Sequence, residues 1–164
     1  MLTVYKIFLV STAFSSALIT GLFYAYSCSV NKGLGRLADA EYLRAMQSIN
    51  RAILNPWFFA SFLGTLILLP VCAWLIYKNE TGSIAFYFLL VSALLYFFGV
   101  FGVTIFGNVP INDILDKFDL GSATIPEIKV QRIEVEKPWN RFHLIRTIAS
   151  LFSLLLTLCA IIIL

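Results

Sequence analysis

Long uncharged apolar runs alternate with short polar stretches along this chain. The runs without charge lie between Lys6 and Lys32, between Arg51 and Lys78, between Glu80 and Asp113, and after Arg146. A helix needs about 20 apolar residues to cross the hydrocarbon core of a bilayer, and in lipid the backbone must satisfy its own hydrogen bonds. The pattern therefore predicts four membrane-spanning helices, near 5–30, 57–77, 83–107 and 142–163.

A second pattern separates the first two predicted spans. Between residues 36 and 55, apolar side chains recur at helical spacing, at Ala38, Tyr42, Ala45, Ile49, Ala52 and Ile53. Arg44, Gln47 and Arg51 fall on another face, as in a helix that lies at a membrane interface. We therefore expect an all-α fold: a four-helix transmembrane bundle with an interfacial amphipathic helix between spans 1 and 2, as a single membrane domain over 1–164.

The region between the third and fourth spans is the most polar part of the chain. Asn112 is a candidate N-cap for a short helix near 113–118. Partial alternation of Ile128, Val130, Ile133 and Val135 allows a short strand or an ordered loop. We treat 108–140 as a polar loop and assign no structure to 119–138.

Composition agrees with the membrane prediction and excludes several function classes. The chain is 60% hydrophobic and 13% charged, against about 45–50% apolar and about 25% charged residues in soluble domains. A net charge of +3, spread over loops, gives no nucleic-acid signature. Cys28, Cys72 and Cys159 lack the spacing of a disulfide framework or zinc site. We expect no metal and no cofactor, and one histidine supports haem poorly.

The distribution of positive charge predicts the orientation in the membrane. Of the 12 Lys and Arg residues, Lys6 and Lys78 fall on the side of the termini, and the other 10 fall on the opposite side. Positive charge collects in the cytoplasm. We expect an integral protein of the plasma (inner) membrane with both termini outside and membrane lipids as its surroundings.

Three ionisable residues at the edges of apolar runs are candidates for chemistry. Arg51 and Arg146 either anchor the chain to lipid headgroups or point inward and bind an anion or an enolate oxygen. His143 lies three residues before Arg146, so the two share a helix face. A nearby cation and partial burial disfavour imidazolium, and the neutral ring is then available as a general base; the alternative is a histidine bonded to water or a carbonyl at the interface.

Amide side chains cluster near the predicted span ends on the same side of the membrane. They are Asn31, Gln47, Asn50, Asn55, Asn108, Asn112 and Asn140. Helix capping explains several of the asparagines. The set as a whole exceeds what capping requires, and it predicts a polar pocket beneath an apolar bundle, suited to a flat apolar ligand with a few oxygens.

Several blocks of the chain resemble the DUF1772, or anthrone oxygenase-like, family of small four-span membrane proteins. The blocks are residues 21–27, 45–50, 55–56, 107–112 and 139–147, and the resemblance covers most of the chain apart from 113–138. Met46-Gln47-Ser48-Ile49-Asn50 and Gly107-Asn108-Val109-Pro110-Ile111-Asn112 are its most specific parts. The resemblance implies a metal-free oxidoreductase that acts on a flat apolar aromatic substrate.

The chemistry implied by the resemblance assigns roles to the candidate residues. A base removes a proton from an acidic methylene, and the enolate gives an electron to dioxygen. His143 is then the base, Arg146 and Arg51 are the oxyanion partners, and Gln47, Asn50, Asn108, Asn112 and Asn31 bind or orient the substrate. Two other classes stay open: a non-enzymatic accessory subunit of a larger membrane complex or homo-oligomer, and a quinone- or lipid-binding membrane protein.

Overall fold

The computed structural model describes residues 4–80 and 82–164, and its regular elements in these ranges are all helical. A first continuous helical stretch comprises α1 (Val4–Ala25), a π-helical segment η1 (Tyr26–Val30) and α2 (Asn31–Leu34). Helices α3 (Asp39–Ala52) and α4 (Pro56–Asn79) follow. A second continuous helical stretch comprises α5 (Ile84–Leu94), the π-helical segments η2 (Leu95–Gly102) and η3 (Thr104–Asn108), and α6 (Val109–Lys117). Helix α7 (Ile125–Ile162) ends the chain.

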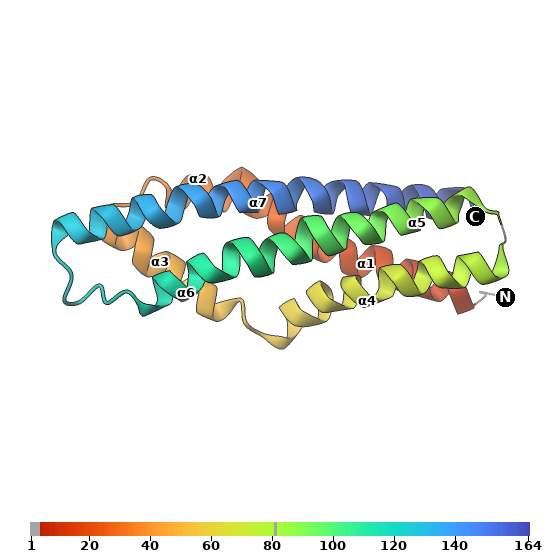
Figure 1. Ribbon diagram of the computed structural model, residues 1–164, viewed down its shortest axis with the longest axis horizontal. Coiled ribbons are helices and arrows are strands. Elements are labelled where there is room, and N and C mark those ends of the chain that lie inside the picture. The colour runs from red at the N-terminus through yellow and green to blue at the C-terminus, as the bar shows by residue number, and fades with distance from the viewer. Residues whose placement is uncertain (1–3, 81) are drawn as a thin grey trace.

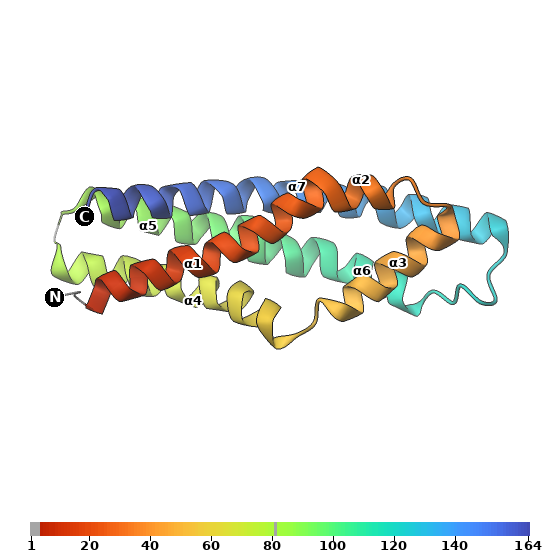
Figure 2. The ribbon, with the colours of Figure 1, turned by 180° about the vertical axis from the view of Figure 1, so that it is seen from behind.

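The two continuous helical stretches and the helices α4 and α7 are each long and apolar enough to cross a membrane. They form a bundle in which α1 begins and α7 ends at one end, while α3, α6 and the connection to α7 lie at the other (Figures 1 and 2). The predicted four-helix transmembrane bundle, with an amphipathic helix between its first two spans, is therefore confirmed. The chain is an integral membrane protein; the orientation of its termini stays a prediction.

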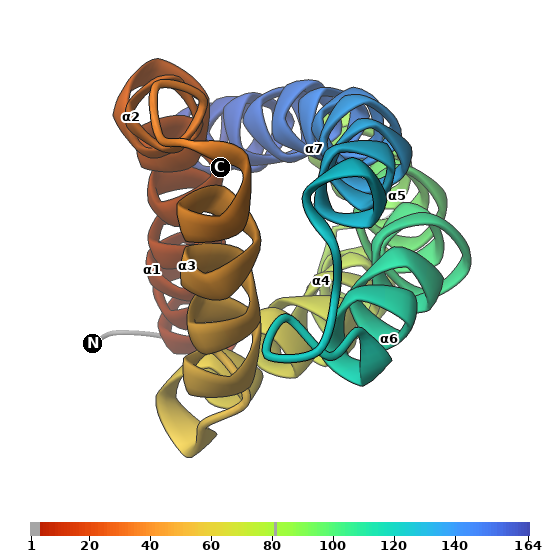
Figure 3. The same cartoon turned by 90° about the vertical axis from the view of Figure 1, so that its left-hand side faces the viewer.

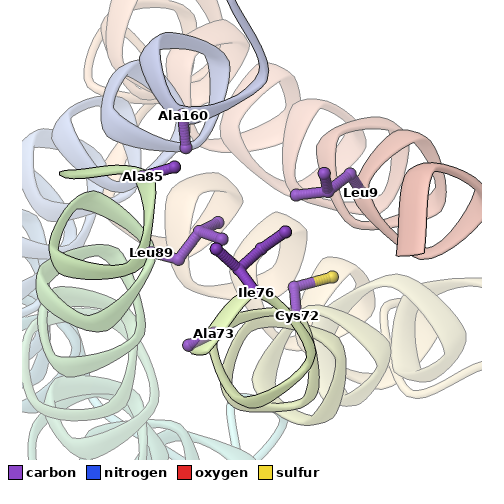
Figure 4. Packing of buried hydrophobic residues seen from close by; sticks show 7 residues of the cluster. All are labelled: Leu9, Cys72, Ala73, Ile76, Ala85, Leu89 and Ala160. Atoms are coloured by element: carbon purple, nitrogen blue, oxygen red, sulfur yellow. The ribbon is translucent and has the colours of Figure 1, made fainter. Parts of the chain in front are cut away.

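Small residues and buried hydroxyls bring the spanning helices together. At the end near the termini, seven buried side chains from α1, α4, α5 and α7 converge (Figure 4): Leu9, Cys72, Ala73, Ile76, Ala85, Leu89 and Ala160. Further along, the Ser92 hydroxyl on α5 lies 2.8 Å from that of Ser153 and 2.9 Å from that of Thr157, both on α7. Such small polar residues let helices approach closely and hydrogen-bond to each other, which matters because lipid provides no hydrophobic driving force for helix association.

Helix α3 packs its apolar face against protein. Tyr42, Leu43 and Met46 are buried together with Leu115 of α6 and Val135 of α7. Viewed from that end, α3 crosses between the α2 side of the bundle and the start of α4 (Figure 3). A second core therefore lies beyond the apolar spans, and it fixes α3 against α6 and α7.

The prediction of a polar loop over 108–140 is wrong, because α6 and the first part of α7 fill most of it. Helix α7 has 38 residues, about 57 Å at 1.5 Å per residue, so it begins well before the predicted span at 142. A capping box starts it: the carboxylate of Glu127 accepts from the Thr124 amide and hydroxyl, both at 2.7 Å. Val130 and Ile133, which suggested alternation, are exposed on this helix.

Candidate functional site

A cavity of about 140 Å³ lies where the end of α3, the start of α4 and η3 meet α1 and α7. Aromatic and aliphatic side chains make most of its wall: Leu22, Phe23, Ile49, Ile53, Leu54, Phe58, Phe59, Phe62, Ile105, Val109 and Trp139. Its polar lining comes from Tyr26, Asn50, Thr104, Asn112 and Arg146. An apolar chamber with a few convergent polar groups is the usual form of a small-molecule site.

Among the residues that the structure describes, Arg146 is the only charged one in the lining of this cavity, and it is 8% exposed. Within residues 4–80 and 82–164, no carboxylate forms an ion pair with it. Its guanidinium carbon lies 4.5 Å from the ring centre of Phe23 and 5.2 Å from that of Trp139. These aromatic faces hold the cation by cation–π attraction. Because Arg146 also lines the cavity, an anion bound there would offset the cost of burying the charge.

His143 lies directly behind Arg146, one helical turn away. Its ring is buried and stacks on Trp139, with ring centres 5.1 Å apart and planes at 10°. Nδ1 accepts from Nε of Arg146 at 3.3 Å, and Nε2 lies 3.0 Å from the hydroxyl of Ser27. The structure thus brings His143 and Arg146 together at one site. The basic nitrogen faces the arginine, and His143 itself is outside the cavity lining.

Asn112 and Asn50 line the cavity from α6 and α3. Oδ1 of Asn112 accepts from the Trp139 indole N–H at 2.9 Å and from Nδ2 of Asn50 at 3.1 Å. Asn112 lies inside α6, so the prediction that it caps a helix beginning at 113 is wrong. Because its oxygen takes both donors, its own NH2 group is oriented away from them and can donate to a ligand.

Two π-helical segments frame the site. Segment η1 begins at Tyr26, which lines the cavity, and also contains Ser27. Segment η3 begins at Thr104, also in the lining, and ends at the fully buried Asn108. A π turn inserts one residue and rotates the side chains that follow, and such turns recur at functional sites.

The other predicted site residues lie away from the cavity. Arg51 is exposed and pairs with Asp116 of α6 at 2.6 Å. Nε2 of Gln47 donates to the carbonyls of Leu115 and Phe118, at 2.8 and 2.9 Å, and so caps the end of α6. Both contacts attach α3 to α6, so the structure gives these two side chains an interhelical role.

Asn108 and Asn31 complete the predicted set. Nδ2 of Asn108 donates to the Trp139 carbonyl at 3.3 Å, which joins η3 to α7 behind the cavity wall. Asn31 begins α2 and is partly buried, outside the cavity lining. No group of three or more His, Cys, Asp or Glu side chains in the part of the chain that the structure describes could hold a metal ion.

Sequence reasoning missed the hydroxyls and rings that surround His143. Ser27, Thr147 and Phe23 are close to it or to Arg146. In the sequence, Ser27 is one of many small residues of the first span, and its distance in the chain from His143 hides the contact. The signal that could have found it is the run Tyr26-Ser27-Cys28-Ser29, an unusually polar end for a lipid-facing helix.

Comparison with families of known proteins gives a match for this chain. A family described as anthrone oxygenase matches residues 57–156, which include Asn108, Asn112, Trp139, His143 and Arg146. The match covers more than half of the chain but leaves out η1 and α3. Neither the curated proteins nor the solved structures that were compared contain a match to this chain.

Proposed function

Because the chain belongs to the anthrone oxygenase family, we propose that it is a membrane enzyme that oxidises a flat, apolar aromatic ketone at an acidic methylene group. Dioxygen is the oxidant, and no metal or organic cofactor takes part. The family match supports the reaction class, and the chemistry of the cavity supports the kind of substrate.

The single observation that carries the proposal is that Arg146 lines an apolar cavity and pairs with no carboxylate of the residues that the structure describes. A buried cation without a counter-anion is costly, and an enolate oxygen would supply the missing negative charge at the step where it develops. Stabilisation of a developing oxyanion in a water-poor site is commonly the largest catalytic contribution. Asn112 lies in the same wall and offers an amide donor.

The cavity suits one ring of a polycyclic substrate. Its volume is about 140 Å³, and an engineered apolar cavity of about 150 Å³ binds benzene. An apolar groove between α1 and α4 shares Leu22, Ile53 and Phe58 with the cavity wall. We propose that the reacting ring occupies the cavity, that the other rings extend into this groove, and that the substrate arrives from the bilayer.

The proposed reaction converts a methylene group and O2 into a ketone and water. A base takes one methylene proton, and the enolate transfers an electron to O2. The two radicals join through a new C–O bond. The hydroperoxide then loses its second C–H proton and breaks its O–O bond, and water leaves. Arg146 stabilises the enolate oxygen, and His143 is the candidate base.

Turnover of anthrone by the purified full-length chain in nanodiscs tests the proposal. The wild-type chain is expected to produce anthraquinone under ¹⁸O2 with one labelled oxygen per product. Arg146→Gln is expected to lower kcat/KM by about 10²–10³, while Arg141→Gln, at an exposed arginine of the same helix, leaves it unchanged. Absence of turnover above the protein-free rate contradicts the proposal. If His143→Ala oxidises anthrone at the wild-type rate, His143 is not the base.

A quinone-binding role is the second candidate, and the cavity itself favours it over an accessory subunit. The same aromatic walls and arginine would hold a quinone carbonyl without turnover. Titration with anthraquinone, followed by quenching of tryptophan fluorescence, separates the two. Saturable binding that depends on Arg146, in a chain that does not oxidise anthrone, selects the binding protein. An accessory subunit would show neither.

A further inference from the structure

The two ring nitrogens of His143 face different partners: Nδ1 faces a guanidinium, and Nε2 faces a hydroxyl. Nδ1 lies 3.3 Å from Nε and 3.2 Å from Nη2 of Arg146. A guanidinium only donates hydrogen bonds, so Nδ1 must carry the lone pair. In a neutral imidazole the proton is then on Nε2.

The Nε2–H group donates to the first of two hydroxyls, which are linked to each other by a further hydrogen bond. Nε2 lies 3.0 Å from Oγ of Ser27, which lies 3.2 Å from Oγ1 of Thr147. The Thr147 hydroxyl donates to the His143 carbonyl at 2.8 Å. Each hydroxyl therefore has a donor on one side and an acceptor on the other, and the direction of the whole chain is set at Arg146.

This direction is the reverse of that in a Ser–His–Asp triad. There the histidine accepts the serine proton, and a carboxylate receives the other N–H. Here a cation occupies the position of that carboxylate, so the imidazole donates to Ser27. The arrangement does not activate Ser27 as a nucleophile.

We infer that Ser27 is a positioning residue for His143: by accepting the Nε2 proton, it stabilises the tautomer that Arg146 selects and holds the imidazole with Nδ1, its basic nitrogen, facing Arg146. The π-helical turn that begins at Tyr26 places Ser27 on this ring while Tyr26 lines the cavity. Lying outside the cavity lining, Ser27 acts through the histidine.

The inference deepens the proposed function and rests on it in one respect, the use of Nδ1 as a base. At rest, Arg146 covers Nδ1. The carbonyl oxygen of the bound ketone, which gains negative charge as the methylene proton leaves, competes for the same guanidinium, and as it draws the N–H groups away, Nδ1 becomes free to accept that proton. Oxyanion binding and exposure of the base are thereby coupled through one side chain.

The chain has a single histidine, so ¹⁵N labelling of histidine reports this ring alone. The full-length chain, purified in nanodiscs through a tag without histidine, is expected to show a protonated Nε2 and an unprotonated Nδ1. Because Arg146 still donates to Nδ1, Ser27→Ala is expected to keep this tautomer but to shift the Nε2 resonance, since the Nε2 proton loses the Ser27 acceptor, and Ser27→Thr is expected to restore the wild-type spectrum. A wild-type ring protonated at Nδ1, or a Ser27→Ala spectrum identical to that of the wild type, overturns the inference.

Two further measurements separate a positioning role from a structural one. With anthrone, Ser27→Ala is expected to lower kcat about five- to tenfold, the equivalent of one hydrogen bond, with KM unchanged. The exposed neighbour Ser29→Ala should match the wild type. If Ser27→Ala does not fold, Thr147→Val removes the partner of the Ser27 hydroxyl and is expected to shift the Nε2 resonance; an unchanged resonance there overturns the inference. The spectra need no turnover, so an inactive chain with the expected tautomer refutes only the proposed function.

Discussion

The indole N–H of Trp139 donates to Oδ1 of Asn112 at 2.9 Å, and this bond joins α7 to α6 at the wall of the cavity. Trp139 also stacks on His143. Its orientation therefore sets the position of the imidazole, and a side chain on α6 controls a ring on α7. The relationship shows how the site depends on the second core beyond the apolar spans.

Asn112→Ala removes the acceptor of two donors at once, the indole of Trp139 and the amide of Asn50. A buried donor left without a partner costs about 1–3 kcal/mol, so we expect a lower midpoint of thermal unfolding. Ligand affinity should fall as well, because the indole is free to turn. Asn79→Ala, at the exposed end of α4, is the matched control. Stability and affinity equal to those of the wild type would show that the indole does not depend on Asn112.

Arg51→Gln tests whether the second predicted arginine belongs to the site. The side chain of Arg51 is 65% exposed and that of its partner Asp116 is 51% exposed, and such surface pairs contribute about 0–1 kcal/mol. We expect little change in stability and no change in ligand binding or kcat/KM. A tenfold loss of affinity for anthraquinone in a titration would place Arg51 at the ligand after all.

Gly99→Ala is expected to separate two spanning helices. A Cβ at Gly99 would lie 2.6 Å from Cβ of Ala149 on α7, so the helices must move apart. Overpacking of this kind costs about 1–3 kcal/mol, and we expect a lower unfolding midpoint in denaturant. Gly21→Ala is the control, since a Cβ there meets nothing within 4 Å. Equal destabilisation of both variants would refute the packing argument.

Arg132→Ala is expected to loosen the turn between α2 and α3. Arg132 donates to four groups: the carbonyls of Gly35 and Leu37 and the carboxylates of Asp39 and Glu136. The loss of these charge-assisted bonds should cost about 1–3 kcal/mol and raise amide hydrogen exchange in residues 35–38. The exposed Lys129→Ala, on the same helix, should leave exchange unchanged.

Asp119 makes the connection between α6 and α7 sensitive to acid. Hydrogen bonds from the Ser122 hydroxyl and the Gly121 amide lower the pKa of its carboxyl below the ordinary value of 3.8. A lowered pKa in the folded state means that the stabilisation is present above pH 3.8 and is lost as the pH falls through the folded value. We expect Asp119→Asn to reduce the slope of unfolding midpoint against pH in that acid range. Parallel slopes in the two proteins would contradict this.

The polar segment between the third and fourth spans shows where prediction from sequence failed. Hydrophobic alternation suggested a strand or loop, yet Gln131, Val135 and Trp139 are buried at helical spacing along α7. The Thr124–Glu127 capping box was readable in the sequence as a helix start. Helices α3 and α6 pack against this part of α7, and a local pattern does not reveal partners that lie elsewhere in the chain.

By itself, the sequence determined the four spans, the amphipathic helix and the family. The physical reason is that uncharged runs of this length have no stable alternative to a helix in lipid. Only the tertiary structure decided which polar residues share a site. Arg51 and Arg146 look alike at the edges of their runs, but the rotation and packing of their helices turn Arg51 toward Asp116 and Arg146 into the cavity.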